Sequence, residues 1–178
     1  DTFGYADAGF LGDWAKAVLT EYPDFAMVGE EWSTNPAVVA HWQRGNRNAS
    51  GHVPHMPAMM DFPVHVALRN ALVQPEGWES GWIGLYEMLA NDFLYPDPGA
   101  LVVFAENHDT PRLLAHVDGD LALWKLGMAC LATVRGTAVE FDSLKPDDVI
   151  ARLQPLATPG QPFFGSAGEM IGMALIAK

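Results

Sequence analysis

The sequence predicts a parallel α/β fold, because short apolar runs alternate with helical segments along most of the chain. Residues 25–29 form an apolar run without polar alternation, which is typical of a strand buried on both faces. Residues 100–104 give the clearest strand pattern, and residues 121–134 give the clearest helical pattern. Of the 178 residues, 49% are hydrophobic, which is enough for a core and excludes a disordered chain.

The first half of the chain supplies two further helices and one further strand. Apolar side chains recur on one stripe over residues 9–22, and Pro23 ends this predicted helix. A strand is expected over residues 57–62. Pro63 then stands at a favourable first helical position before a helix over residues 64–72.

The second half is expected to contain a loop over residues 74–84 and a short helix over residues 85–93. After Gly136 the composition of the sequence changes to polar and Pro/Gly-rich stretches. The predicted domain organisation is therefore one α/β unit over residues 1–136 and an unassigned C-terminal tail over residues 137–178.

Charge and composition exclude several classes of protein. There are 10 Lys and Arg against 22 Asp and Glu, a net charge of −12 that disfavours binding to nucleic acid. The single cysteine, Cys130, excludes an intramolecular disulfide framework. No apolar run has the length of a membrane span, and no signal peptide is visible. Because the chain opens at Asp1 without Met, we expect it to be part of a longer protein; cytoplasm or periplasm, and the oligomeric state, stay open.

Acidic residues stand where each predicted strand ends and at the start of the chain: Glu30 and Glu31, Asp61, Asp109, and Asp1. The carboxyl ends of parallel strands carry the active site in α/β folds. Converging carboxylates repel one another and separate their pKa values, so that one acts as an acid while another stays ionised. Glycoside hydrolysis needs that division of roles.

Three sequence blocks together resemble the alpha-amylase family (glycoside hydrolase family 13), and within it the neopullulanase/cyclomaltodextrinase/alpha-amylase group: Asp1-Thr2-Phe3-Gly4-Tyr5, Val28-Gly29-Glu30-Glu31-Trp32 and Phe104-Ala105-Glu106-Asn107-His108-Asp109. Their order and separation match the family over about residues 1–136. The resemblance implies that the chain forms the later strands and helices of a partial (β/α)8 barrel, or TIM barrel. Many amylases have Lys-His three and four residues after the nucleophile, where this chain has Gly4 and Tyr5.

The resemblance also implies roles for the residues in these blocks. Asp1 matches the nucleophile, and Glu30 matches the general acid/base. His108 and Asp109 match residues that hold the sugar in the cleavage subsite, and the aspartate also stabilises the transition state. Glu31 is expected to orient or repel its neighbour.

Four other positions are predicted to contact substrate: Asn107, Tyr5, Trp32 and Arg112. Trp32 has two readings, a stacking platform for a sugar face or a packed core ring. Arg112 is expected to pair with Asp109 or with another carboxylate. Asp109 itself has the alternative role of a helix N-cap.

The function implied by the resemblance is hydrolysis, with retention, of α-1,4-glucosidic bonds in starch-derived oligosaccharides or cyclodextrins. The isolated chain is expected to be inactive, and the alternative is a truncated, non-catalytic remnant that binds carbohydrate weakly. An unrelated metal-dependent hydrolase is a third reading, but Glu30, His108 and Asp109 lack the tight spacing of metal ligands. We therefore predict no metal site and no cofactor here, with structural calcium left open for the parent protein.

Overall fold

The computed structural model describes residues 3–135, 147, 150–151 and 154. The chain divides into two compact units, residues 1–137 and residues 138–178. The first unit is described below. The predicted tail over residues 137–178 lies almost entirely outside the described residues.

Parallel strand segments lie at the centre of the first unit. Strand β1 (Val28–Gly29) pairs in parallel with β2 (Ala58–Met59). Val102 bridges in parallel to Met60 at the end of β2. Its backbone N–H donates to the Met59 carbonyl, and its carbonyl accepts from the Asp61 N–H, both at 2.9 Å. The order of these segments in space is therefore their order in the sequence, as in a parallel α/β fold.

The predicted strand over residues 100–104 was wrong in its extent. Only Val102 within this run forms a bridge, and the run begins inside a 3-10 helix, η3 (Pro98–Ala100). Leu101 is fully buried, while the other four residues of the run are half-buried. The apolar composition of a run does not fix the length of a strand, because strand length depends on ladder partners elsewhere in the chain.

Three predicted helices are confirmed with small boundary shifts. Helix α1 (Ala8–Glu21) begins where the Asp7 carboxylate accepts the Phe10 N–H at 2.8 Å. Helix α3 (Phe62–Val73) contains Pro63 in its first turn, as predicted. Helix α6 (Leu121–Thr133) has Asp120 as its N-cap, and the Asp120 side chain accepts hydrogen bonds from two backbone N–H groups.

The remaining helices differ from the expectation. Helix α4 (Gly81–Leu89) begins inside the predicted loop, and η2 (Ala90–Leu94) continues it. Three short elements were not predicted: η1 (Phe3–Tyr5), α2 (Pro36–His41) and α5 (Leu113–His116).

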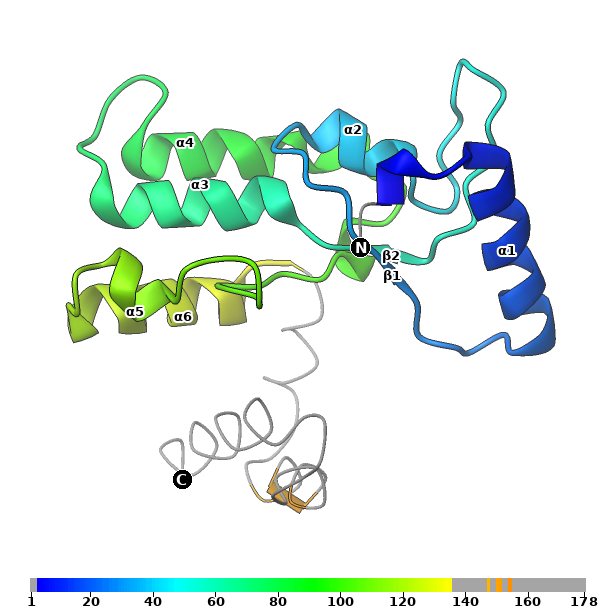
Figure 1. Ribbon diagram of the computed structural model, residues 1–178. Coiled ribbons are helices and arrows are strands. Elements are labelled where there is room, and N and C mark those ends of the chain that lie inside the picture. The colour runs from blue at the N-terminus through cyan, green and yellow to red at the C-terminus, as the bar shows by residue number, and fades with distance from the viewer. Residues whose placement is uncertain (1–2, 136–146, 148–149, 152–153, 155–178) are drawn as a thin grey trace. The chain divides into compact units, whose positions relative to one another are not determined.

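Two hydrophobic clusters flank the strand segments. One joins η1, α1, α2, β2 and Met27 just before β1, and includes Phe3, Ala15 and Met59. The other joins α3, α4, α5 and α6, and includes Leu68 and Leu113. Figure 1 shows α1 on one side of the strands and α3 to α6 on the other, with α3 packed along α4. Glu30, Glu31 and Asp61 come just after the strands, and Asp109 follows the Val102 segment.

Candidate active site

A pocket of about 510 Å³ lies where β1 and the Val102 segment end. Its lining combines three acids with aromatic and small residues: Phe3, Gly4, Tyr5, Glu30, Glu31, Trp32 and Asp109. Four of the predicted site residues, Tyr5, Glu30, Trp32 and Asp109, therefore meet at one pocket. Asp1 lies outside the described residues, so its role stays a prediction.

Glu30 is positioned by the end of β1. Its side chain is 7% exposed, and its backbone carbonyl accepts the Phe3 N–H at 2.9 Å. That bond attaches η1 beside β1. The Phe3 ring is buried and packs edge-on against Trp42, with centroids 5.3 Å apart. The residues that follow Asp1 in the sequence are thus held next to Glu30.

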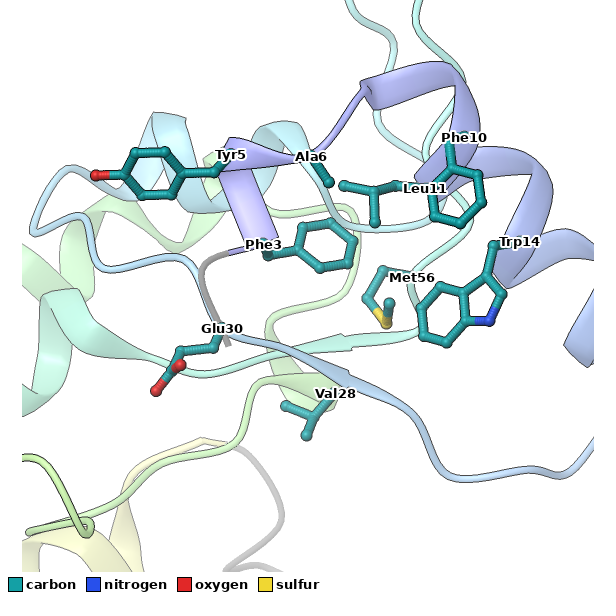
Figure 2. A pocket seen from close by; sticks show the side chains of 9 residues that line it. All are labelled: Phe3, Tyr5, Ala6, Phe10, Leu11, Trp14, Val28, Glu30 and Met56. Carbon is teal, nitrogen blue, oxygen red and sulfur yellow. The ribbon is translucent and has the colours of Figure 1, made fainter.

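A second hollow of about 530 Å³ shares Glu30 with the first and is mainly apolar. Figure 2 shows Phe3, Leu11 and Met56 gathered together, with the Glu30 carboxylate pointing away from them. The carboxylate therefore lies at the margin of apolar surroundings and at the wall of an acidic pocket.

Asp109 reaches the pocket from the loop after Val102. Its carboxylate lies 3.2 Å from His108 Nε2, and both side chains are at least half exposed. Its backbone N–H donates to the Asn107 side chain at 3.1 Å. The capping alternative for Asp109 is wrong, because the N-cap of the next helix, α5, is Arg112. Asn107 shapes the loop that presents Asp109 and does not line the pocket.

Arg112 pairs with Glu106, at 2.7 Å between Nη1 and Oε1, so of the two expected alternatives the structure shows pairing with a carboxylate other than Asp109. The other Glu106 oxygen accepts the Leu113 N–H. Glu106 therefore closes the loop over residues 106–113 onto α5. The sequence analysis missed this residue, although it stands directly before Asn107 in the third block.

Trp32 packs on aromatic neighbours and is also exposed at the pocket, while stacking on a sugar face stays a prediction. Its ring packs on Phe62, with centroids 4.5 Å apart, and 49% of the residue is exposed. Phe62 packs in turn against Phe104, at 5.1 Å. The aromatic stack supports the indole from behind and leaves part of it at the pocket.

Asp61 stands at the end of β2 but does not join the pocket. It is fully buried, accepts the Val64 N–H at 3.1 Å and pairs with Arg135 at 2.5 Å. Complete burial raises the pKa of the Asp61 carboxyl, and the Arg135 cation opposes this rise. Its role is to connect helices.

Within the part of the chain that the structure describes, no three His, Cys, Asp or Glu side chains are grouped so that they could hold a metal ion. Likewise, none of the helices in that part is long and apolar enough to cross a membrane.

Parallel strand segments, connecting helices and acids at the strand ends define a parallel α/β domain with an acidic pocket after its strand segments. The family description "Alpha amylase, catalytic domain" matches residues 4–142. The chain therefore belongs to the alpha-amylase family, which argues against the unrelated metal-dependent hydrolase.

Solved structures agree with this assignment. The alpha-amylase of Geobacillus thermoleovorans complexed with acarbose is similar with a TM-score of 0.61 and 26% identity, over 76% of this chain and 29% of that chain. The fold is also similar to an Anoxybacillus alpha-amylase (TM-score 0.55, 24% identity, 74% and 28% coverage). The cyclomaltodextrin glucanotransferase CldA is similar with a TM-score of 0.58 and 21% identity, over 73% and 25%. The chain spans less than a third of the length of these structures.

Proposed function

We propose that the chain is part of the catalytic domain of a retaining glycoside hydrolase that cleaves α-1,4-glucosidic bonds in starch-derived oligosaccharides or cyclodextrins. One observation carries this proposal. Glu30 and Asp109 follow different strand segments, far apart in the sequence, and line the same pocket. Family membership and the acarbose complex of a similar amylase support an α-glucan as the substrate.

In the proposed mechanism Glu30 protonates the glycosidic oxygen of the leaving sugar, while Asp1 attacks the anomeric carbon. Water then attacks the anomeric carbon of the covalent glycosyl-enzyme, Glu30 takes a proton from that water, and the bond between the sugar and Asp1 breaks. A retaining enzyme requires the two carboxyl groups to lie about 5–5.5 Å apart. The bond from the Phe3 N–H to the Glu30 carbonyl supports this geometry, because Phe3 is two residues from Asp1.

The other predicted residues bind the sugar ring. Asp109 and His108 would form hydrogen bonds with hydroxyl groups of the sugar, and Asn107 would fix the turn that presents them. The exposed part of Trp32 offers an apolar face for the C–H side of glucose, and Tyr5, which is 91% exposed, offers another.

Arg112 remains a proposed substrate contact on the same loop. Its side chain is 73% exposed and is anchored by Glu106, so a flexible glucan could reach it. We assign no cofactor, and no step of the proposed mechanism uses a metal ion.

The decisive test is Glu30→Gln in the full-length gene product, assayed by release of reducing ends from maltooligosaccharides. General acid/base catalysis is worth typically 10²–10⁴-fold, so kcat should fall by at least about 100-fold. Glu87→Gln, at an exposed position on α4, is the matched control and should retain full activity. Unchanged turnover in Glu30→Gln would refute the role of Glu30, and NMR of the first anomer released tests retention.

The alternative is a non-catalytic remnant that binds glucan weakly. The chain spans 29% of the length of the first similar structure, so the activity of this chain by itself needs its own test. We expect the 178-residue chain alone to show little or no hydrolysis. Robust turnover by that chain, lost in Glu30→Gln, would exclude the remnant.

A further inference from the structure

Glu31 makes a set of contacts that none of the roles above explains. Its Oε2 accepts a hydrogen bond from the Trp42 indole Nε1 at 3.0 Å. The same oxygen lies beside Gly4, so closely that a Cβ added to Gly4 would overlap it. Glu31 also lines the 510 Å³ pocket, directly next to Glu30.

Trp42 connects this carboxylate to η1 in a second way. Its ring packs edge-on against Phe3, while its indole N–H holds Glu31. Phe3 is bonded through its backbone to Glu30. The turn Phe3–Tyr5 therefore has three contacts: a backbone hydrogen bond to Glu30, a ring contact to Trp42 directly after α2, and the Glu31 carboxylate beside Gly4.

We infer that Glu31 is a positioning residue, whose carboxylate is fixed by Trp42 and holds the turn Phe3–Tyr5 at the pocket wall beside Glu30. This inference rests on the proposed function, because the turn carries Tyr5 and follows Asp1. The glycine at position 4 is a consequence of the same arrangement, since the Glu31 carboxylate occupies the space that a side chain there would need.

The chemistry of the contact indicates which substitutions keep it. A half-buried indole N–H needs an acceptor, and an ionised carboxylate is a stronger one than a neutral group. Glutamine has the same length and offers a carbonyl oxygen to Trp42, so Glu31→Gln should preserve the turn. Glu31→Ala removes the acceptor and opens the space beside Gly4.

The first experiment is a double-mutant cycle in thermal unfolding with Gly4→Ala, Glu31→Ala and the double variant. Gly4→Ala alone should lower Tm, because the new Cβ overlaps the carboxylate. In the Glu31→Ala background the same change should cost much less. Glu87→Ala, an exposed change on α4, is the control background and should give no relief. An equal loss of Tm in all backgrounds overturns the inference.

The second experiment measures steady-state kinetics on maltooligosaccharides in the full-length gene product. A misplacement of about 1 Å costs around 100-fold, so Glu31→Ala should lower kcat by about 10–100-fold with little change in KM. Glu31→Gln should restore most of kcat. A rise in KM that Gln does not rescue would make Glu31 a direct sugar contact and overturn the positioning role.

The two proposals fail in different ways. If the wild-type protein does not hydrolyse glucans, the proposed function fails, while the unfolding cycle still decides whether Glu31 holds the turn. If the wild type hydrolyses glucans and Glu31→Ala is as active, only the inference about Glu31 fails.

Discussion

The substitution Asp61→Asn tests how the end of α6 is joined to the start of α3. Asp61 Oδ1 accepts the Val64 N–H, and Oδ2 contacts Arg135 at 2.5 Å. Arg135 also contacts Asp92 through Nε at 2.6 Å. Asparagine keeps an oxygen for the cap but removes the charge that faces Arg135. The variant therefore isolates the ion pair from the cap.

The expected cost follows from burial. Removing one partner of a buried pair costs about 3–5 kcal/mol, because the other charge stays buried without compensation. Asp92 remains beside Arg135 and its side chain is partly exposed, which places the expected loss near the lower end, at about 3 kcal/mol. Asp61→Ala also loses the cap, worth about 1 kcal/mol more. With an m-value of roughly 1.5 kcal/mol/M, the urea midpoint should fall by roughly 2 M in Asp61→Asn.

Urea titration followed by tryptophan fluorescence measures both variants. Asp13→Asn, at an exposed position on α1, is the control and should stay within about 0.5 kcal/mol of the wild type. The reasoning is refuted if Asp61→Asn loses less than about 1 kcal/mol, or if Asp61→Ala is the more stable of the two.

Three further predictions concern buried positions: Tyr95 in the first hydrophobic cluster, Gly127 on α6 and His65 on α3. The buried Tyr95 hydroxyl has no hydrogen-bond partner among the residues the structure describes, so Tyr95→Phe should be neutral or stabilising by up to about 1 kcal/mol. A clear loss of stability in urea titration would contradict this. An added Cβ at Gly127 would lie 2.9 Å from Leu72 Cδ1, so Gly127→Ala should destabilise by about 1–3 kcal/mol despite its better helix propensity, and an unchanged midpoint contradicts this. Burial lowers the pKa of His65, and the hydrogen bond to Phe104 opposes this, so the unfolded chain takes up the proton first and stability falls as pH drops through about 6.5. Tm measured from pH 7.5 to 5.5 should fall less steeply in His65→Gln, and equal slopes would contradict the assignment.

The elements that sequence alone predicted well carry their own start and stop signals. Helix α1 has a regular apolar stripe and Pro23 after it, and α3 has Pro63 in its first turn. Helices α2 and α5, of six and four residues, are too short for periodicity to show. The run over residues 100–104 failed as a strand because backbone pairing is a property of neighbouring segments, which its own letters do not encode.

The candidate site was likewise predictable from the sequence only in part. The rule that acids after parallel strands converge predicted that Glu30 and Asp109 lie close together, and both line one pocket. It did not distinguish Asp61, whose position after β2 is equivalent but whose side chain is directed into the core by Arg135. The sequence also left two alternatives for the partner of Arg112, because the choice between Asp109 and Glu106 depends on the fold of one loop.

Gly4 and Glu31 show why a departure from a family pattern needs a three-dimensional explanation. In the sequence, the departure from the family pattern at position 4 and the acid that follows Glu30 are two unconnected features. In the structure they are one feature, because the carboxylate occupies the space that the glycine leaves and Trp42 fixes it there. A side chain at position 4 therefore requires the Glu31 carboxylate to leave the place where Trp42 holds it. A homologue with a larger residue at position 4 should therefore lack the anchored acid, or should hold its first turn at a different distance from the general acid.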